Sequence, residues 1–329
     1  MLTRRAVIVS ATSALAIRAF TSPARANQVL KLGYILPQDS QLGAGAAAFA
    51  DTVKKHTGGK LAIEQYPNSA LGGDLEMIKG VQTGQIDLAF ITSPPFTGLI
   101  PEFGVFEIPF LFRNAAHAQA VFDSPIGQEY LKKISAKDMV ALGWGENGLR
   151  HLTNSKRPVK TPQDIAGLKI RVPQSDVMVQ GFQALGAVAE PLAFPALYGA
   201  LEAGKFDGEE NPIATIVASK FDKVQKYLSM TGHVYSWAVF IMSKDAYEDL
   251  SEEERTAFVA AAAAGGAASR KYAADAEKTG VEALRKAGME VTIDIDRAAF
   301  VTALKPVQQK FAQTYGPALI ERIDKTPQV

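Results

Sequence analysis

Residues 161–173 read Thr-Pro-Gln-Asp-Ile-Ala-Gly-Leu-Lys-Ile-Arg-Val-Pro, and this stretch joins a helix start to a strand. Thr161 is suited to cap a helix and Pro162 to occupy its first position. Residues 168–172 then alternate apolar and basic side chains, which predicts a short strand with Lys169 and Arg171 on one face. A helix followed directly by a strand is typical of α/β proteins.

The same alternation of helices and strands continues toward the N-terminus. The pattern predicts three strands and two helices, at 29–36, 61–66 and 86–91 and at 45–56 and 74–83 respectively. Gly84-Gln85-Ile86-Asp87 turns from a helix into a strand, and Gly204-Lys205-Phe206-Asp207 does so again 120 residues later. We therefore expect an α/β fold with two lobes of related build.

A long segment without proline precedes the C-terminus. Ser251 and Glu254 form the pattern of a capping box, and no proline follows before Lys286. A single helix of about 35 residues would be about 50 Å long, which exceeds a domain of ordinary size. We expect it to span both lobes unless Gly265-Gly266 breaks it in two.

The composition excludes several classes of protein. The chain has 329 residues, enough for roughly two domains with their own cores. It contains no cysteine, which excludes disulfides, thiolate metal sites, a cysteine nucleophile and a lipid anchor on cysteine. Its formal net charge of +1 provides no general basic footprint for nucleic acid.

Residues 1–26 have the features of an export signal. They combine Arg4 and Arg5, an apolar run at 6–17 and the small-x-small pattern Ala24-Arg25-Ala26. The apolar run is shorter than the roughly 20 residues of a membrane-spanning helix. The paired arginines leave open whether export follows the twin-arginine or the Sec route. We expect a mature protein that begins near residue 27, lies in the periplasm and is neither inserted in the membrane nor lipid-anchored.

Signals for an enzyme are weak. Gly43-Ala44-Gly45 with Ala48 matches a dinucleotide fingerprint, but residues 37–42 separate it from the preceding strand. The other interpretation is an alanine-rich helix that needs close packing. The four histidines are too widely spaced for a metal site, and no G-x-S-x-G element occurs. An exported nucleotide-dependent oxidoreductase is one alternative; otherwise we expect no cofactor and no metal.

Polar residues gather where strands are expected to end. Residues 144–151 combine a carboxylate, an amide and an arginine with two glycines, residues 207–212 add another amide, and Arg171 lies on its own strand. Ligands of open α/β sheets bind outside the carboxyl ends of the strands. A guanidinium held on a strand matches one carboxylate with two hydrogen bonds. The cluster therefore favours a carboxylate ligand.

Five motifs together resemble the extracytoplasmic solute-binding proteins of TRAP transporters, the tripartite carboxylate uptake systems. They lie at 68–74, 108–112, 148–154, 168–173 and 207–212, and the resemblance covers essentially the whole mature chain. It implies an α/β, two-lobed periplasmic-binding-protein fold with crossing strands and a long helix spanning both lobes. The N-terminal lobe would comprise 27–148 plus about 237–276, and the C-terminal lobe 149–236 plus about 277–329.

The resemblance also implies the ligand contacts. Arg171 matches the family arginine that forms a bidentate pair with the ligand carboxylate, and three further matches in the same lobe are Arg150, Asn211 and Phe194. The opposite lobe would contribute Gln38, Thr92, Ser93 and Trp237. Such a protein is not an enzyme. It is expected to be a monomer that closes on a small carboxylate and delivers it to the membrane subunits of a TRAP transporter.

The resemblance leaves the acid open. Thr92 stands about where the sialic-acid branch has an acidic residue, which disfavours that ligand. Glu146-Asn147-Gly148 resembles members that bind sugar acids such as uronates. A carboxylate at Glu146 would accept hydrogen bonds from sugar hydroxyls and would repel a dianion. A uronate or another sugar acid is therefore favoured, while Arg150, as a second arginine, keeps a C4-dicarboxylate as the alternative.

Overall fold

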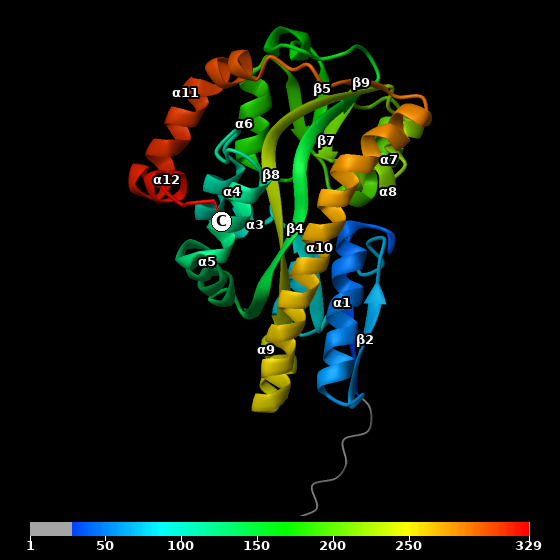
Figure 1. Ribbon diagram of the computed structural model, residues 1–329, viewed down its shortest axis with the longest axis vertical. Coiled ribbons are helices and arrows are strands. Elements are labelled where there is room, and N and C mark those ends of the chain that lie inside the picture. The colour runs from blue at the N-terminus through cyan, green and yellow to red at the C-terminus, as the bar shows by residue number, and fades with distance from the viewer. Residues whose placement is uncertain (1–27, 329) are drawn as a thin grey trace, which may run out of the picture.

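One mixed sheet runs through the whole molecule (Figure 1). The computed structural model describes residues 28–328, so the predicted signal segment 1–26 lies outside the described residues. Within the described part the strand order is β2-β1-β3-β8-β4-β7-β5-β6, with β9 paired to β8. The strands are β1 Gln28–Gly33, β2 Leu61–Tyr66, β3 Leu88–Thr92, β4 Met139–Asn154, β5 Lys169–Val172, β6 Val188–Pro191, β7 Gly208–Pro212, β8 Tyr227–Ser243 and β9 Glu290–Thr292.

The two ends of the sheet are parallel three-stranded units with the same connections. β1 pairs with β2 and β3, and β5 pairs with β6 and β7, in parallel in every case. The Asp87 carboxylate accepts the Lys31 N–H at 2.8 Å, and the Asp207 carboxylate accepts the Lys169 N–H at 2.8 Å. Both aspartates end the helix-to-strand turns noted in the sequence, so that similarity reflects a structural repeat.

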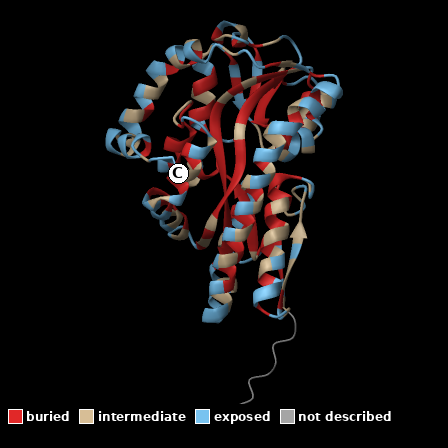
Figure 2. Cartoon of the chain, viewed as in Figure 1, coloured by how far each residue is buried: buried red, intermediate tan, exposed pale blue. Residues whose placement is uncertain are grey.

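β4 and β8 are long antiparallel strands that join the two units. β8 also pairs with β3 of the first unit, and β4 also pairs with β7 of the second. Figure 2 shows both strands buried along most of their length. These two strands therefore form the crossing connection of a two-lobed fold.

Helices surround the sheet in both lobes. The first lobe carries α1 Gln41–His56, α2 Asp74–Gln82, α3 Phe96–Leu99, α4 Ala115–Asp123, α5 Pro125–Ser135, α9 Lys244–Glu248 and a 3-10 helix at Pro101–Glu107. The second carries α6 Asp176–Ala184, α7 Leu197–Glu202, α8 Ile213–Ala218 and 3-10 helices at Pro162–Ile165, Phe194–Ala196 and Phe221–Lys223. The remaining helices are α10 Glu252–Lys286, α11 Arg297–Tyr315 and α12 Pro317–Asp324. Within 28–328, no helix combines the length and the apolar character needed to cross a membrane.

The hydrophobic core is divided between the lobes. The first lobe holds one large cluster, built around stacked aromatic rings such as Phe90 and Phe240, whose centroids are 3.8 Å apart. The second lobe holds two smaller clusters, one around Phe182 of α6 and one around Phe221. Separate cores are what allow two lobes to move relative to each other.

α10 is one continuous helix of 35 residues. Its predicted capping box is present, since Ser251 Oγ accepts the Glu254 N–H at 3.2 Å and the Glu254 carboxylate accepts the Ser251 N–H at 2.8 Å. The glycine pair does not break the helix. A Cβ at Gly266 would lie 2.2 Å from the Trp144 carbonyl oxygen, so this glycine lets α10 lie directly on β4. α10 runs beside α1 and then α8, and it thereby spans both lobes (Figure 1).

The glycines of the G-x-G-x-x-A pattern serve packing at the start of α1. The helix begins earlier than predicted because Ser40 caps it by accepting the Gly43 N–H. A Cβ at Gly43 would lie 2.0 Å from the Gln38 carbonyl oxygen, and one at Gly45 would lie 3.0 Å from the Gly265 carbonyl oxygen. Gly43 thus allows the loop before α1 to lie against the start of the helix, and Gly45 allows the backbones of α1 and α10 to approach closely.

The C-terminal helix departs from the expected division of the chain. We expected 277–329 in the C-terminal lobe, and α11 does pack against α6. α12 returns to the first lobe instead, where His117 Nε2 lies 2.9 Å from the Ile323 carbonyl oxygen and Arg322 pairs with Glu129 at 3.2 Å. We therefore propose the lobe boundaries given above with α12 transferred to the N-terminal lobe.

Candidate functional site

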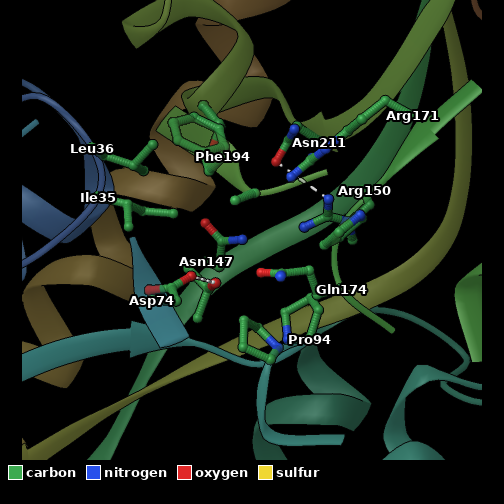
Figure 3. Close-up of a pocket in the computed structure, with 15 residues that line it drawn as sticks. Ile35, Leu36, Asp74, Pro94, Asn147, Arg150, Arg171, Gln174, Phe194 and Asn211 are labelled. Atoms are coloured by element: carbon green, nitrogen blue, oxygen red, sulfur yellow. Dashed lines mark hydrogen bonds between the residues drawn. The ribbon is translucent and has the colours of Figure 1, made fainter. Parts of the chain in front are cut away.

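A pocket lies between the lobes, at the carboxyl ends of strands from both parallel units (Figure 3). Polar side chains from β3, β4, β5, β7, α2 and α8 form one part of its wall. Apolar residues that follow β1, β3, β5 and β6 form most of the rest. The lining residues are Ile35, Leu36, Asp74, Thr92, Pro94, Pro95, Asn147, Arg150, Arg171, Pro173, Gln174, Ala193, Phe194, Asn211 and Thr215.

Arg171, on β5, is a buried guanidinium that no carboxylate pairs directly, although the charges of Glu209, Glu210 and Asp74 act on it from farther away. It is 2% exposed, and its Nε and Nη2 both donate to the Leu192 carbonyl oxygen, at 2.9 and 2.6 Å. These bonds occupy one edge of the guanidinium and leave the Nη1–Nη2 edge free to pair with a carboxylate. No carboxylate among the described residues forms an ion pair with it. Burial lowers the pKa of Arg171 to about 10.

Arg150, on β4, is equally buried, but its charge is already paired. Its Nε and Nη2 donate to the two carboxylate oxygens of Glu210, at 2.6 and 2.8 Å. His233 Nε2 lies 3.1 Å from the same carboxylate, and the Asn211 side-chain oxygen accepts from Arg150 Nη2 at 3.2 Å. Burial raises the pKa of Glu210, but the charges and hydrogen bonds of Arg150 and His233 together outweigh burial and hold the pKa below its ordinary value. Arg150 therefore offers the pocket hydrogen-bond donors without an uncompensated charge.

The opposite end of the pocket presents acceptors. Asp74 is the first residue of α2, and its Oδ2 accepts the Thr92 hydroxyl at 2.6 Å. Its Oδ1 is buried and has no hydrogen-bond partner among the described residues. Burial raises the pKa of Asp74 to about 7, against the opposing effects of Thr92 and Arg171. Figure 3 shows Asp74 at one end of the pocket and Arg171 with Arg150 at the other.

Six of the ten predicted contact residues line this pocket. They come from five different elements and reach it together only in the folded chain: Arg171, Arg150, Asn211, Asn147, Phe194 and Thr92. Their contact with a ligand stays a prediction. The other four, which lie outside the pocket, are Glu146, Trp237, Ser93 and Gln38.

A β-bulge in β4 separates Asn147 from Glu146. Glu146 is opposite Trp237 of β8, whereas Gly148 is opposite Ser236, so Asn147 is an extra residue without a partner in the ladder. Gly148 has φ +128°, a backbone conformation that favours glycine. Since opposite residues of an antiparallel pair share a face, Glu146 and Trp237 point together, away from the pocket that Asn147 lines.

The contacts of Glu146 and Trp237 place both side chains outside this pocket, and their contact with a ligand stays a prediction. Glu146 accepts from Gln119 Nε2 at 2.6 Å, and burial raises its pKa to about 7. Trp237 is 1% exposed and packs in the aromatic core, with its ring centroid 4.7 Å from that of Trp144. Glu146 therefore does not face this pocket, so the structure gives no support to the sequence argument that used it for a uronate.

Ser93 and Gln38 lie near the pocket without lining it. Ser93 is fully buried and donates its hydroxyl to Glu107 Oε1 at 2.7 Å. The Gln38 side chain is exposed, and only its backbone is covered, by Gly43 of α1. Strand alternation explains the first case, because Thr92 and Ser93 are adjacent and point to different sides.

Sequence reasoning missed three polar residues of the pocket, Asp74, Thr215 and Gln174, the last of which directly follows the motif 168–173. Asp74 ends the motif 68–74 that was used for the resemblance, and its position at a helix start could have indicated a buried acceptor. Thr215 follows the motif 207–212 by three residues, on α8, and nothing in its sequence context singles it out.

The described residues offer no alternative chemistry based on a metal. Within 28–328, no three or more His, Asp or Glu side chains are grouped so that they could hold a metal ion. The titratable groups of the pocket are instead two arginines and one aspartate, which suit binding of an anion.

A family model described as bacterial extracellular solute-binding protein, family 7, matches residues 32–314. The chain is also 36% identical to the 2,3-diketo-L-gulonate-binding periplasmic protein YiaO of Escherichia coli, over 94% of this chain and 95% of that protein. It is 31% identical to the C4-dicarboxylate-binding periplasmic protein DctP of Rhodobacter capsulatus, over 98% of each.

Among solved structures, a TRAP periplasmic solute-binding protein of Polaromonas sp. JS666 bound to D-erythronate superposes with a TM-score of 0.89. It is 44% identical and covers 91% of this chain and 99% of its own. These relatives are binding proteins and not enzymes, so the nucleotide-dependent oxidoreductase considered above is wrong as an alternative.

Proposed function

This chain belongs to family 7 of the bacterial extracellular solute-binding proteins, the periplasmic components of TRAP transporters, and we propose that its own ligand is a hydroxylated monocarboxylate, a sugar acid. The ligand is held between the lobes, with its carboxylate on Arg171. The lobes then close, and the membrane subunits of a TRAP transporter receive the closed form. Closure is favoured only by contacts that exist solely in the closed state.

The main support for this proposal is that the two buried arginines of the pocket differ in their ion pairing. Arg171 has no ion-pair partner among the described residues, whereas Arg150 is neutralised by Glu210. The pocket therefore has one guanidinium without a directly paired carboxylate, which matches one ligand carboxylate. A dicarboxylate ligand was the alternative because Arg150 could pair with a second carboxylate. Since Arg150 is already paired with Glu210, it gives little support to that alternative.

The acceptor end of the pocket favours hydroxyl groups over a second carboxylate. Asp74 Oδ1 is a buried acceptor without a partner among the described residues, and a ligand hydroxyl would satisfy it. A second carboxylate at this end would face the Asp74 carboxylate, and like charges in a buried site repel. The apolar wall formed by Ile35, Leu36 and Phe194 would cover the carbon chain of a small ligand.

Two of the relatives support the same class of ligand, whereas the Rhodobacter capsulatus protein is named for C4-dicarboxylates. The Polaromonas protein holds D-erythronate, and the Escherichia coli protein is named for 2,3-diketo-L-gulonate. Both are acids with one carboxylate and several other oxygens. With Glu146 outside the pocket, no residue favours a uronate over an aldonate, so the proposal covers both. Export to the periplasm, with Sec or twin-arginine signal left open, and a monomeric state stay predictions.

The test is a thermal-shift screen followed by calorimetry with D-erythronate, D-galactonate, D-glucuronate and succinate. At least one sugar acid is expected to bind with a micromolar Kd, about −8 kcal/mol, and succinate at least tenfold more weakly. Asp74→Asn is expected to weaken the sugar acid and strengthen succinate, because the acceptor charge is removed. Succinate as the tightest ligand, with an affinity that Asp74→Asn leaves unchanged, would contradict the proposal.

A further inference from the structure

Behind the pocket, six buried side chains form a continuous hydrogen-bonded series. Gln41 Nε2 donates to the Thr215 hydroxyl oxygen at 2.8 Å and to the Asn147 side-chain oxygen at 2.8 Å. Asn147 Nδ2 in turn donates to Ser236 Oγ at 3.3 Å. Ser236 Oγ lies 3.0 Å from Ser93 Oγ, which donates to Glu107. Each of the six is at most 3% exposed.

The direction of every hydrogen bond in the series follows from its two ends. Gln41 Nε2 also lies 3.0 Å from the Asn147 backbone carbonyl oxygen, so one of its two hydrogens is shared between the two oxygens of Asn147. A carbonyl can only accept, so the nitrogen of the Gln41 amide faces Asn147. The Asn147 side-chain oxygen must then face Gln41 and its nitrogen must face Ser236. At the other end, Ser93 gives its only hydroxyl hydrogen to Glu107 when Glu107 is ionised, and Ser236 then donates to Ser93.

This direction decides what the pocket presents to a ligand. Asn147 uses one hydrogen of its side-chain amide for Ser236 and keeps the other. Thr215 accepts from Gln41 and keeps its hydroxyl hydrogen for donation. Both residues line the pocket, and Gln41 does not. Gln41 thus orients two donors of the pocket from outside it.

The same amide bridges the two lobes. Gln41 lies on α1 of the first lobe, Thr215 on α8 of the second, and Asn147 on the crossing strand β4. Gln41 Oε1 is buried with no partner among the described residues, which is unfavourable in itself. The amide nitrogen, with its contacts to both lobes, supplies the reason for a buried glutamine at this position.

We propose that Gln41 is a positioning residue that couples lobe closure to ligand binding. It holds Asn147 and Thr215 as donors and stabilises the arrangement in which α1 and α8 are joined. The proposal rests on the proposed function, in that a ligand between the lobes uses these donors. It concerns a residue that the ligand does not touch.

The test compares Gln41→Met with Gln128→Met, the same substitution at an exposed glutamine on α5 of the first lobe. Binding and dissociation rates are measured with whichever of D-erythronate, D-galactonate, D-glucuronate or succinate stabilises the wild-type protein. Gln41→Met is expected to lower the affinity at least tenfold, mainly through faster dissociation, and Gln128→Met less than twofold.

Closure is read separately, from the distance between spin labels at Lys79→Cys of α2 and Glu202→Cys of α7. The chain has no cysteine of its own, so only these positions react. With ligand at saturation, Gln41→Met is expected to leave a larger open fraction than the wild type. Thr215→Val removes the hydrogen bond between Gln41 and Thr215 from the side of the second lobe and is expected to have the same effect. It replaces Gln41→Met in this experiment if Gln41→Met does not fold.

Unchanged dissociation and an unchanged distance distribution in Gln41→Met would overturn the inference. Failure of the proposed function has a different signature, namely a wild-type protein that binds succinate and none of the sugar acids. The comparison of Gln41→Met with the wild type is then made with succinate and still decides the role of Gln41.

Discussion

Replacing Arg171 by methionine is expected to weaken ligand binding strongly while leaving the ligand-free protein about as stable as the wild type. Burial lowers the pKa of Arg171 to about 10. The difference between this pKa and the ordinary pKa of a guanidinium disfavours the charged form by roughly 3 kcal/mol, at about 1.4 kcal/mol for each pKa unit. Methionine removes this cost and leaves the Leu192 carbonyl without its donor, which costs about 1–3 kcal/mol. The two effects nearly cancel.

Arg150→Met is the matched comparison, because Arg150 is equally buried but paired. Its loss strands the Glu210 carboxylate, which is fully buried. Removing one partner of a buried ion pair costs about 3–5 kcal/mol. The free energy of unfolding of Arg150→Met is therefore expected to fall by that amount, whereas that of Arg171→Met stays within about 1 kcal/mol of the wild type.

Urea unfolding of the ligand-free proteins and calorimetry with the best sugar acid measure the two effects. Two charge-assisted hydrogen bonds of about 1.5–3 kcal/mol each are lost in Arg171→Met, which weakens binding by roughly 10²-fold or more. Our reasoning is refuted if Arg171→Met destabilises the ligand-free protein as much as Arg150→Met does. That result would mean that Arg171 has a structural and not a ligand-binding role.

Three further predictions follow from burial and packing. Burial raises to about 7 the pKa values of four carboxyl groups, those of Asp74, Glu107, Glu146 and Glu209. A carboxyl group whose pKa is raised in the folded state stabilises the fold fully below its unfolded-state pKa near 4, and this stability is lost as the pH rises through about 7. The urea midpoint should therefore be higher at pH 6 than at pH 8.5. A higher midpoint at pH 8.5 would contradict this. Gly266→Ala should destabilise the protein by about 1–3 kcal/mol, because its Cβ would lie 2.2 Å from the Trp144 carbonyl oxygen. Gly199 lies on α7 with open space around it, so Gly199→Ala should stabilise the protein by about 0.5–1 kcal/mol. Equal unfolding midpoints for Gly266→Ala and Gly199→Ala would argue against the close packing of α10 on β4. Glu146→Gln should change the affinity for a sugar acid less than twofold in calorimetry, since Glu146 lies outside the pocket; a large loss would restore its expected role.

Much of the fold could be predicted because its signals are local. The capping box at Ser251 sets the start of α10, and the turns that end at Asp87 and Asp207 indicate the repeated unit. Contacts between elements that are distant in the sequence could not be predicted. Nothing local shows that Gly266 allows a close approach to β4 and does not end the helix, because that depends on a strand more than 100 residues away.

The site was predicted less completely, for a related reason. Asn147 and Glu146 are adjacent and polar, and strand alternation says only that they face opposite sides. The bulge opposite Trp237 and Ser236 decides which of them reaches the pocket. Asp74 lay within a quoted motif, but its role as an acceptor becomes apparent only from its burial and its free oxygen.

The sequence by itself determined the α/β alternation, the two related lobes, the long helix and the arginine on β5, since these depend on side-chain periodicity and helix caps. Only the tertiary structure decided the electrostatics of the pocket. Arg150 and Arg171 are both arginines on strands, and one is neutralised by Glu210 while the other is not. That difference arises because a charge is compensated by whatever the fold brings within hydrogen-bond distance, and Glu210 is 60 residues from Arg150 along the chain.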